Sequence, residues 1–221
     1  EFKSNDARVI YRQDLIDLTT GSIPFPRYGI PNAIGDYSLA IYDRASGLMR
    51  EYFYVKKQAD GSWHFSASGY YKARAYFSDL GVDNFFMQLT TGSSAVVGML
   101  NPLSQIGIEE ARAGVINHAL SVTFPNAAKA VISFPAKQSD GTDENENAPA
   151  QGQWFRIDPS VDLESLGLRP FTLMIAKAVQ KYGAYGADKN HWCFAFNAEH
   201  PINELAQGKA NPWAENGELS K

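Results

Sequence analysis

Short runs of apolar and aromatic residues, separated by turn signals, recur in the first third of the chain, which is typical of β-strands. Residues 37–42 and 49–55 are two such runs, and side-chain alternation along the second places Tyr52 and Tyr54 on one face and Phe53 and Val55 on the other. A hairpin signal, Asp60-Gly61, follows, and residues 63–67 return as the partner strand. This part of the chain therefore predicts a small antiparallel sheet.

Strand signals continue through the rest of the chain. Residues 115–124 alternate cleanly, and His118 falls on the more apolar of their two faces. Residues 108–113 predict a single helical turn, which Gly114 would end. The other apolar runs that we interpret as strands are residues 84–89, 95–100, 130–134, 153–157 and 191–196.

One amphipathic helix is the best-marked element of the sequence. Pro170 suits the first helical position, where its missing N–H costs nothing. Gly183 suits the position after the last turn. Between them, six apolar residues at helical spacing form one continuous stripe: Phe171, Met174, Ile175, Ala178, Val179 and Tyr182. The pattern predicts a helix over residues 170–183.

Many strands joined by turns, with a single packed helix, favour a mainly β fold. The chain has 221 residues and is 44% hydrophobic, which suits one all-β domain of roughly 200–250 residues. We therefore predict a single antiparallel β-sandwich domain over residues 1–221, of jelly-roll or concanavalin-like type. An irregular Gly- and Pro-rich loop at residues 19–36 precedes the strands, and the tail from Asn203 is polar.

The charge of the chain argues against two classes of partner. The net charge is −4 and no cluster of Lys and Arg stands out, so the sequence lacks the footprint of a nucleic-acid-binding protein. No stretch of about 18 apolar residues is present, so no membrane span is predicted.

Familiar enzyme motifs are missing from the sequence, and the four histidines are not spaced as metal pairs. His118 is the most notable of them, because it lies in a probable core strand. It is either a core histidine bonded to a neighbour or an acid/base residue in a cleft. Cys193, in the run Trp192-Cys193-Phe194, is the single cysteine, and we interpret it as a small buried hydrophobic residue rather than a nucleophile.

Residues 139–147 form a polar, acidic loop that includes Asp140. Calcium takes six to eight oxygen ligands, so this loop is a candidate calcium site. It lacks the spacing of a calcium-binding helix–loop–helix motif, and a solvated acidic loop is the favoured interpretation.

An aromatic and polar group around Tyr52, Trp63 and His64 is a candidate ligand site. Aromatic faces stack on the apolar faces of sugar rings, while nearby polar groups bind the hydroxyls. The alternative is that Trp63 packs in the core. Arg156 is a further candidate, although a strand arginine beside Asp158 also suits a surface ion pair.

Several motifs of the C-terminal half resemble a group of largely uncharacterised secreted or lipid-anchored bacterial proteins of β-sandwich type, familiar from actinobacteria. The resemblance implies an extracytoplasmic setting and points to His118, Asp140 and Arg156, but it implies no mechanism. The chain departs from the group in its longer acidic loop after Asp140. The shared segments are residues 116–120, 135–136, 139–141, 155–159, 162–163, 166–168, 175–176 and 180–183.

These observations lead to three hypotheses. The leading one is an extracytoplasmic carbohydrate-binding module, part of a larger adhesin or polysaccharide-degrading protein. The second is a polysaccharide lyase or glycosidase, in which His118 or Tyr52 would act as base and Arg156 would neutralise a uronate carboxylate. The third is a protein-binding surface module.

Overall fold

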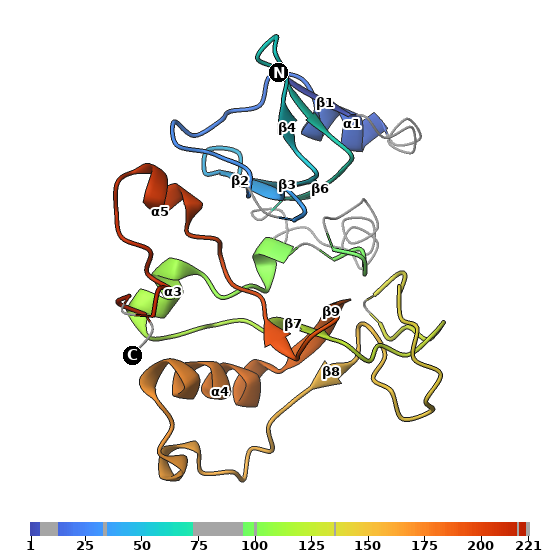
Figure 1. Cartoon of the computed structure of the whole chain (residues 1–221), viewed down its shortest axis with the longest axis vertical. Coiled ribbons are helices and arrows are strands. Elements are labelled where there is room, and N and C mark those ends of the chain that lie inside the picture. Colours follow the sequence, from blue (N-terminus) through green and yellow to red (C-terminus); the bar gives the residue numbers. More distant parts are fainter. Residues whose placement is uncertain are drawn as a thin grey trace. The chain divides into compact units, whose positions relative to one another are not determined.

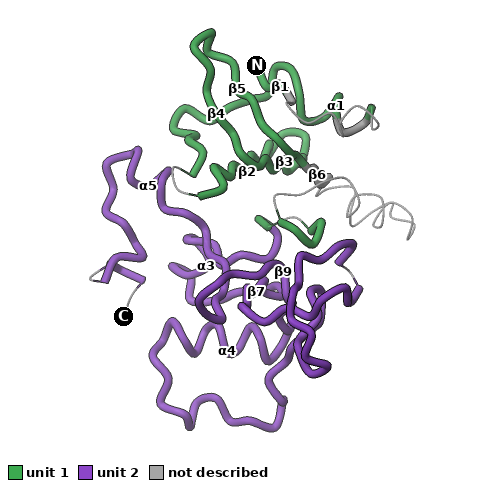
Figure 2. The backbone as a smooth tube through the Cα atoms, turned by 45° about the vertical axis from the view of Figure 1, so that its right-hand side comes forward, with its two compact units in different colours: residues 1–102 green, residues 103–221 purple. Residues whose placement is uncertain are grey.

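The computed structural model describes residues 1–4, 13–32, 35–72, 95–99, 101–134, 136–215 and 217–219. Over these residues the fold is mixed α/β, with three small sheets and a few helices (Figure 1). The backbone divides into two compact units, residues 1–102 and residues 103–221 (Figure 2). Two compact units do not by themselves establish two folding domains, so the single domain stays a prediction.

The described residues of unit 1 form two three-stranded sheets and one short helix. The first sheet is antiparallel, in the order β2 (Leu39–Asp43), β3 (Leu48–Phe53), β6 (Ala67–Lys72). The second has the order β1 (Phe2–Ser4), β5 (Trp63–Phe65), β4 (Lys56–Lys57), and β1 runs parallel to β5. Helix α1 spans Gln13–Thr19.

The strands predicted at residues 37–42 and 49–55 are confirmed, with shifted ends. The hairpin at Asp60-Gly61 is also confirmed, but its first strand is β4, because β3 pairs with β6 instead. Buried side chains from both sheets of unit 1 form one core, consisting of Phe2, Leu39, Ile41, Tyr52, Val55 and Phe65.

Unit 2 is built on one four-stranded sheet in the order β10 (Ala195–Phe196), β7 (Leu120–Phe124), β9 (Ala184–Lys189), β8 (Trp154–Phe155). The central strands β7 and β9 are parallel, and the outer strands are antiparallel to them. The helices of this unit are α3 (Ile108–Ala113), α4 (Pro170–Tyr182) and α5 (Ile202–Ala206). Two 3₁₀ turns accompany them: η3 (Leu163–Leu166), and η2 (Asn101–Leu103), which spans the boundary between the units in the sequence.

The predicted helix is confirmed as α4, which begins at Pro170 and ends before Gly183. Gly183 adopts φ +84° and donates its N–H to the Val179 carbonyl. The buried side of α4, including Met174 and Val179, packs with β7 residues in the core of unit 2 (Figure 1). The turn at residues 108–113 is also confirmed, and Gly114 ends it in the left-handed region at φ +70°.

Five of the predicted strands are wrong or too long, including the strand predicted at residues 153–157, which keeps only β8. Residues 95–99 form turns, and residues 130–134 contain only an isolated bridge at Ile132. The second run is not buried, since Phe134 is 59% exposed. Residues 115–119 are irregular, so the strand begins at Leu120, and the strand predicted at 191–196 keeps only β10. The run at 84–89 lies outside the described residues.

The large antiparallel sandwich is not confirmed by the described strands. They form three small sheets without a closed barrel, and two of the strand pairs are parallel. No helix in the described part of the chain is long and apolar enough to cross a membrane.

The polar C-terminal tail is packed onto unit 2, whereas the sequence suggests a loose segment. The Arg112 guanidinium contacts carboxylates of Glu109, Glu204 and Glu218 at 2.5, 2.6 and 2.6 Å. The Trp213 indole N–H donates to the Glu199 carbonyl at 2.9 Å. We call this cluster around Arg112 the clamp; no local pattern predicts it, because Glu204 and Glu218 lie far from Arg112 along the chain.

The clamp predicts a pH-dependent contribution of Glu204 to stability. Lys209 and Arg112 lower the pKa of the Glu204 carboxyl below its usual value. A carboxyl with a lowered folded pKa stabilises the fold above its unfolded pKa, and this contribution is lost as the pH falls through the folded pKa. We therefore expect Glu204→Gln to lower the melting temperature at pH 7 and to change it less at pH 3.

Calorimetric melts at the two pH values measure this difference. Glu146→Gln, which changes an exposed loop carboxylate, is the matched control. An equal decrease for Glu204→Gln at both pH values would contradict a charge-based role for the carboxylate.

Candidate functional site

The most exposed large apolar side chain of the described residues lies in the turn between β9 and β10. Trp192 is 84% exposed there, and the neighbouring Phe194 is also exposed. Strands β9 and β10 lie on either side of β7, so this turn, residues 190–194, crosses the carboxyl end of β7 (Figure 1). We call residues 190–194 the Trp192 turn.

Asn190 holds the Trp192 turn in a fixed shape. Its side-chain oxygen accepts from the backbone N–H of Trp192 at 2.8 Å and of Cys193 at 2.9 Å. Its side-chain amide donates to the Cys193 carbonyl at 2.7 Å and to the Thr123 hydroxyl of β7 at 2.8 Å. An Asn side chain commonly closes a turn by bonding backbone groups just after it. Trp192 is therefore exposed on a braced turn that is tied to the central sheet.

The chemistry of the Trp192 turn is that of an aromatic binding platform. An indole combines a large apolar face with a polar N–H, so it binds partners that have both apolar and polar surface. His191 lies beside it, with the two ring centroids 6.1 Å apart in an edge-to-face arrangement. Preorganisation by Asn190 lowers the entropy lost when a ligand stacks on the ring.

Cys193 is exposed, so the prediction that it is a buried hydrophobic residue is wrong. The apolar run of residues 192–194 belongs to the Trp192 turn and not to a core strand. Sequence reasoning therefore missed Trp192. Asn190, two residues before the run, was the signal that could have marked a turn.

Tyr52 is a core residue. Its side chain is fully buried, and its hydroxyl donates to the Thr19 carbonyl at 3.1 Å. Burial raises the pKa of this phenol above its usual value. The predicted ligand-binding role of Tyr52 is therefore corrected, because the ring has no free face.

Trp63 and His64 lie on opposite faces of β5, since side chains alternate along a strand. Trp63 is half-buried and stacks on Phe25, with ring centroids 5.2 Å apart and an interplanar angle of 20°. This supports the alternative interpretation, in which Trp63 packs in the core. His64 lies on the outer face of its sheet.

His118 ties the start of β7 to α3. Its Nδ1 lies 2.8 Å from the Ala119 carbonyl oxygen, and its Nε2 lies 3.0 Å from a carboxylate oxygen of Glu110. A carbonyl oxygen only accepts, so Nδ1 carries a proton and donates it. The same Glu110 oxygen accepts from the Gly107 N–H at 3.2 Å. These contacts favour the interpretation of His118 as a bonded structural histidine.

Asp140 forms two hydrogen bonds with the fully buried side chain of Gln151. The Asp140 N–H donates to the Gln151 amide oxygen at 2.9 Å, and the Gln151 amide donates to the Asp140 carboxylate at 2.8 Å. Arg156 is exposed, and its Nε donates to the Gln180 carbonyl at 2.8 Å. In the part of the chain that the structure describes, no hydrogen bond or ion pair joins any two of His118, Asp140 and Arg156.

The acidic loop shows no preformed metal centre among the described residues, where no group of three His, Cys, Asp or Glu side chains could hold an ion. Its carboxylates bond protein donors instead. Asp143 accepts from the Asn145 N–H and the Asn126 amide, and Glu144 pairs with Lys129. Calcium binding stays a prediction.

Comparison of the chain with protein-family models, with curated proteins and with solved structures found no match. The resemblance of the C-terminal half to secreted bacterial proteins therefore stays a prediction.

Proposed function

We propose that the chain is an extracytoplasmic carbohydrate-binding module and that Trp192 is its main sugar-stacking residue. The observation that carries this proposal is the 84% exposure of Trp192 on a turn that Asn190 braces. An indole face that is buried against a sugar ring stabilises the complex, and the exposed His191 and Phe194 extend this surface. The extracytoplasmic setting rests on the resemblance of the C-terminal half alone.

The enzyme hypotheses receive less support from the geometry. A lyase would use His118 or Tyr52 as its base. Both ring nitrogens of His118 have partners within the fold, and Tyr52 is buried with its hydroxyl bonded to the Thr19 carbonyl. A protein-binding module would use the same exposed Trp192, so the proposal needs a test that separates sugars from proteins.

Trp192→Ala is expected to weaken glycan binding at least tenfold, because truncation of a central aromatic residue typically costs about 2 kcal/mol. A glycan array with the whole chain selects the ligand, and calorimetry then measures its affinity. Trp154→Ala is the matched control, since Trp154 is also exposed but lies on the edge strand β8.

Asn190→Ala should weaken binding by a smaller factor, because it loosens the turn but leaves the indole in place. Binding of no glycan on the array would refute the proposal, as would equal affinities of the wild type and Trp192→Ala. Capture of a protein partner that depends on Trp192, without glycan binding, would favour the protein-binding alternative.

A further inference from the structure

Three basic side chains lie in one row across the second sheet of unit 1. In this sheet Lys3 of β1 and Lys56 of β4 are both in register with His64 of β5. Residues paired in register share a face, so all three lie on the face opposite Phe2 and Trp63. The two lysines therefore lie on either side of His64 on one face of the sheet.

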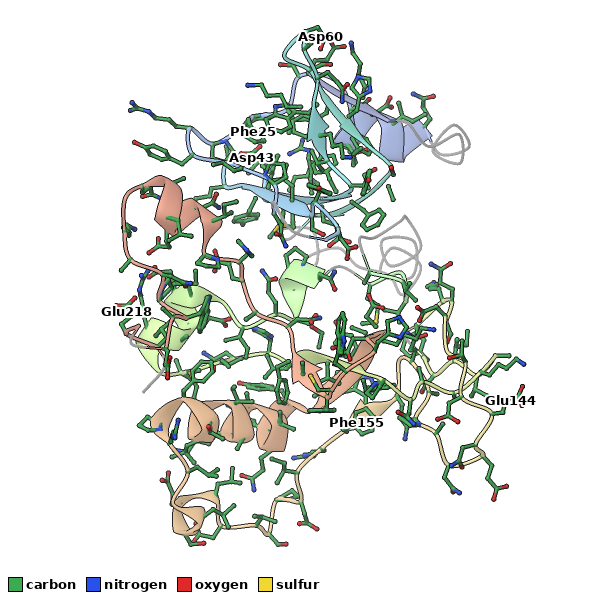
Figure 3. The ribbon with its side chains drawn as sticks, viewed as in Figure 1. Phe25, Asp43, Asp60, Glu144, Phe155 and Glu218 are labelled. Carbon is green, nitrogen blue, oxygen red and sulfur yellow. The ribbon has the colours of Figure 1, made fainter. Side chains whose placement is uncertain are left out.

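The two ends of this row differ in their surroundings. At one end, Lys3 lies 3.6 Å from a Glu1 carboxylate and 3.9 Å from the carboxylate of Asp60, at the tip of the β4–β5 hairpin (Figure 3). At the other end, the Lys56 ammonium forms no ion pair within the residues that the structure describes. Lys56 is exposed, so its charge is available to a ligand.

Two tyrosine rings surround the Lys56 ammonium. It lies 4.4 Å from the centre of the Tyr54 ring and 5.1 Å from that of the Tyr37 ring. The rings meet edge to face, with centroids 5.3 Å apart. Lys56 donates to the Tyr54 hydroxyl at 3.2 Å, which leaves the proton of that hydroxyl free to donate. The Lys56 ammonium and the Tyr54 hydroxyl are therefore two neighbouring hydrogen-bond donors, and the Tyr37 and Tyr54 rings provide aromatic surface beside them.

The backbone at this place is strained. Tyr37 and Tyr54 adopt φ +48° and +57°, and Ala130 is the only other described non-glycine residue with positive φ. Such a conformation is sterically unfavourable for a residue with a Cβ, and it persists where the surrounding structure enforces it. Here the two segments hold each other, since the Tyr54 N–H donates to the Asp36 carbonyl and the Val55 N–H to that of Tyr37. Strain of this kind is frequent at ligand clamps.

We propose that Lys56, Tyr54 and Tyr37 form a binding site for a carboxylate. The Lys56 ammonium pairs with the carboxylate, and the Tyr54 hydroxyl donates to it. The tyrosine faces contact the carbon skeleton that bears the carboxylate. The carboxylate belongs either to an acidic sugar, such as a uronate, or to a free organic acid. This site lies in unit 1 and does not depend on the Trp192 turn, so either proposal can fail alone.

Calorimetry of the whole chain with oligogalacturonate at low salt tests the site. Lys56→Ala should weaken binding at least tenfold, whereas Lys56→Arg, which keeps the positive charge, should retain most of the wild-type affinity. Lys57→Ala is the matched control, because Lys57 is the next residue in β4 and lies on the opposite face of the sheet from Lys56. The Lys57 ammonium lies 5.6 Å from the centre of the Trp63 ring. Binding should also weaken as salt screens the charge.

Further arms of the titration separate the sources of the carboxylate. A fully methyl-esterified oligogalacturonate should bind at least tenfold more weakly than the acid. Acetate and a monomeric uronate are each titrated as competitors of the bound oligogalacturonate. Equal competition at equal concentration would assign the site to free carboxylates, and weaker competition by acetate would assign it to acidic sugars. Equal binding by the wild type and Lys56→Ala, or by acid and ester, would overturn the proposal, whereas Trp192→Ala should leave this binding unchanged.

Discussion

Gly152→Ala is expected to destabilise unit 2 by roughly 3 kcal/mol or more. Two costs add up to this figure: alanine is unfavourable in the left-handed backbone region, and its Cβ would clash with neighbouring atoms. Gly152 adopts φ +83°, and a Cβ placed there would lie 1.9 Å from the Ser133 carbonyl oxygen and 2.7 Å from the Ala136 Cβ. The neighbouring chain cannot move away freely, because the Ser133 N–H donates to the Gln151 carbonyl at 2.9 Å. Urea denaturation of purified wild type and variant measures the difference.

Gly208→Ala is the matched control for this substitution. Gly208 has a similar φ of +78°, but no atom lies within 4 Å of the position that a Cβ would take. It should therefore lose only the backbone contribution, about 1–2 kcal/mol. Equal losses for the two variants would show that the close approach at Gly152 does not exist in solution.

Phe65→Ala is expected to destabilise unit 1 by about 3–5 kcal/mol, the usual cost of emptying a fully buried aromatic site. Phe65 is fully buried and packs edge to face on Tyr52, with ring centroids 5.0 Å apart. The surrounding rings of Phe2 and Tyr52 stack on each other at 4.8 Å, so they cannot easily collapse into the space. Chemical denaturation followed by circular dichroism measures the loss.

Tyr42→Ala is the control for Phe65→Ala, because Tyr42 lies on β2 but is 47% exposed. It should change stability by about 0.5 kcal/mol or less. A small effect of Phe65→Ala, close to that of Tyr42→Ala, would contradict the core described for unit 1.

The same denaturation curves test the prediction of a single domain. A chain that folds as one cooperative unit shows one transition, and Phe65→Ala then shifts the whole of it. Two transitions, of which Phe65→Ala shifts one and Gly152→Ala the other, would contradict the prediction.

Local signals in the sequence predicted the elements whose patterns are self-contained. Helix α4 has its apolar stripe, Pro170 and Gly183 within one segment, and β2 and β3 are short runs rich in apolar and aromatic residues on either side of a turn. Strand β9, by contrast, was not predicted. Its sequence, Ala-Tyr-Gly-Ala-Asp-Lys, lacks β-branched residues, and its strand structure depends on pairing with β7 and β8.

The candidate sites were harder to predict than the elements. Alternation predicts that Tyr52 and Tyr54 share a face, but Tyr52 is buried in a core that Phe2 completes, whereas Tyr54 adopts a positive φ and is exposed. The basic row depends on the register of three strands, two of which, β1 and β4, were not predicted. The apolar run at residues 192–194 was predicted to be part of a buried strand, but it lies in an exposed turn. Apolar composition alone does not distinguish these two cases.

The clamp around Arg112 has a consequence for the order of events during synthesis. Arg112 and Glu218 lie 106 residues apart in the chain, and Arg112 and Glu204 lie 92 apart. At about 5–20 residues per second, a ribosome makes α3 roughly 5–20 s before the last of these carboxylates. During that interval, Glu109 is the only one of the three carboxylates within reach of the Arg112 guanidinium. The charge cluster that fastens the tail is therefore completed last, after the sheet and α4 have been made.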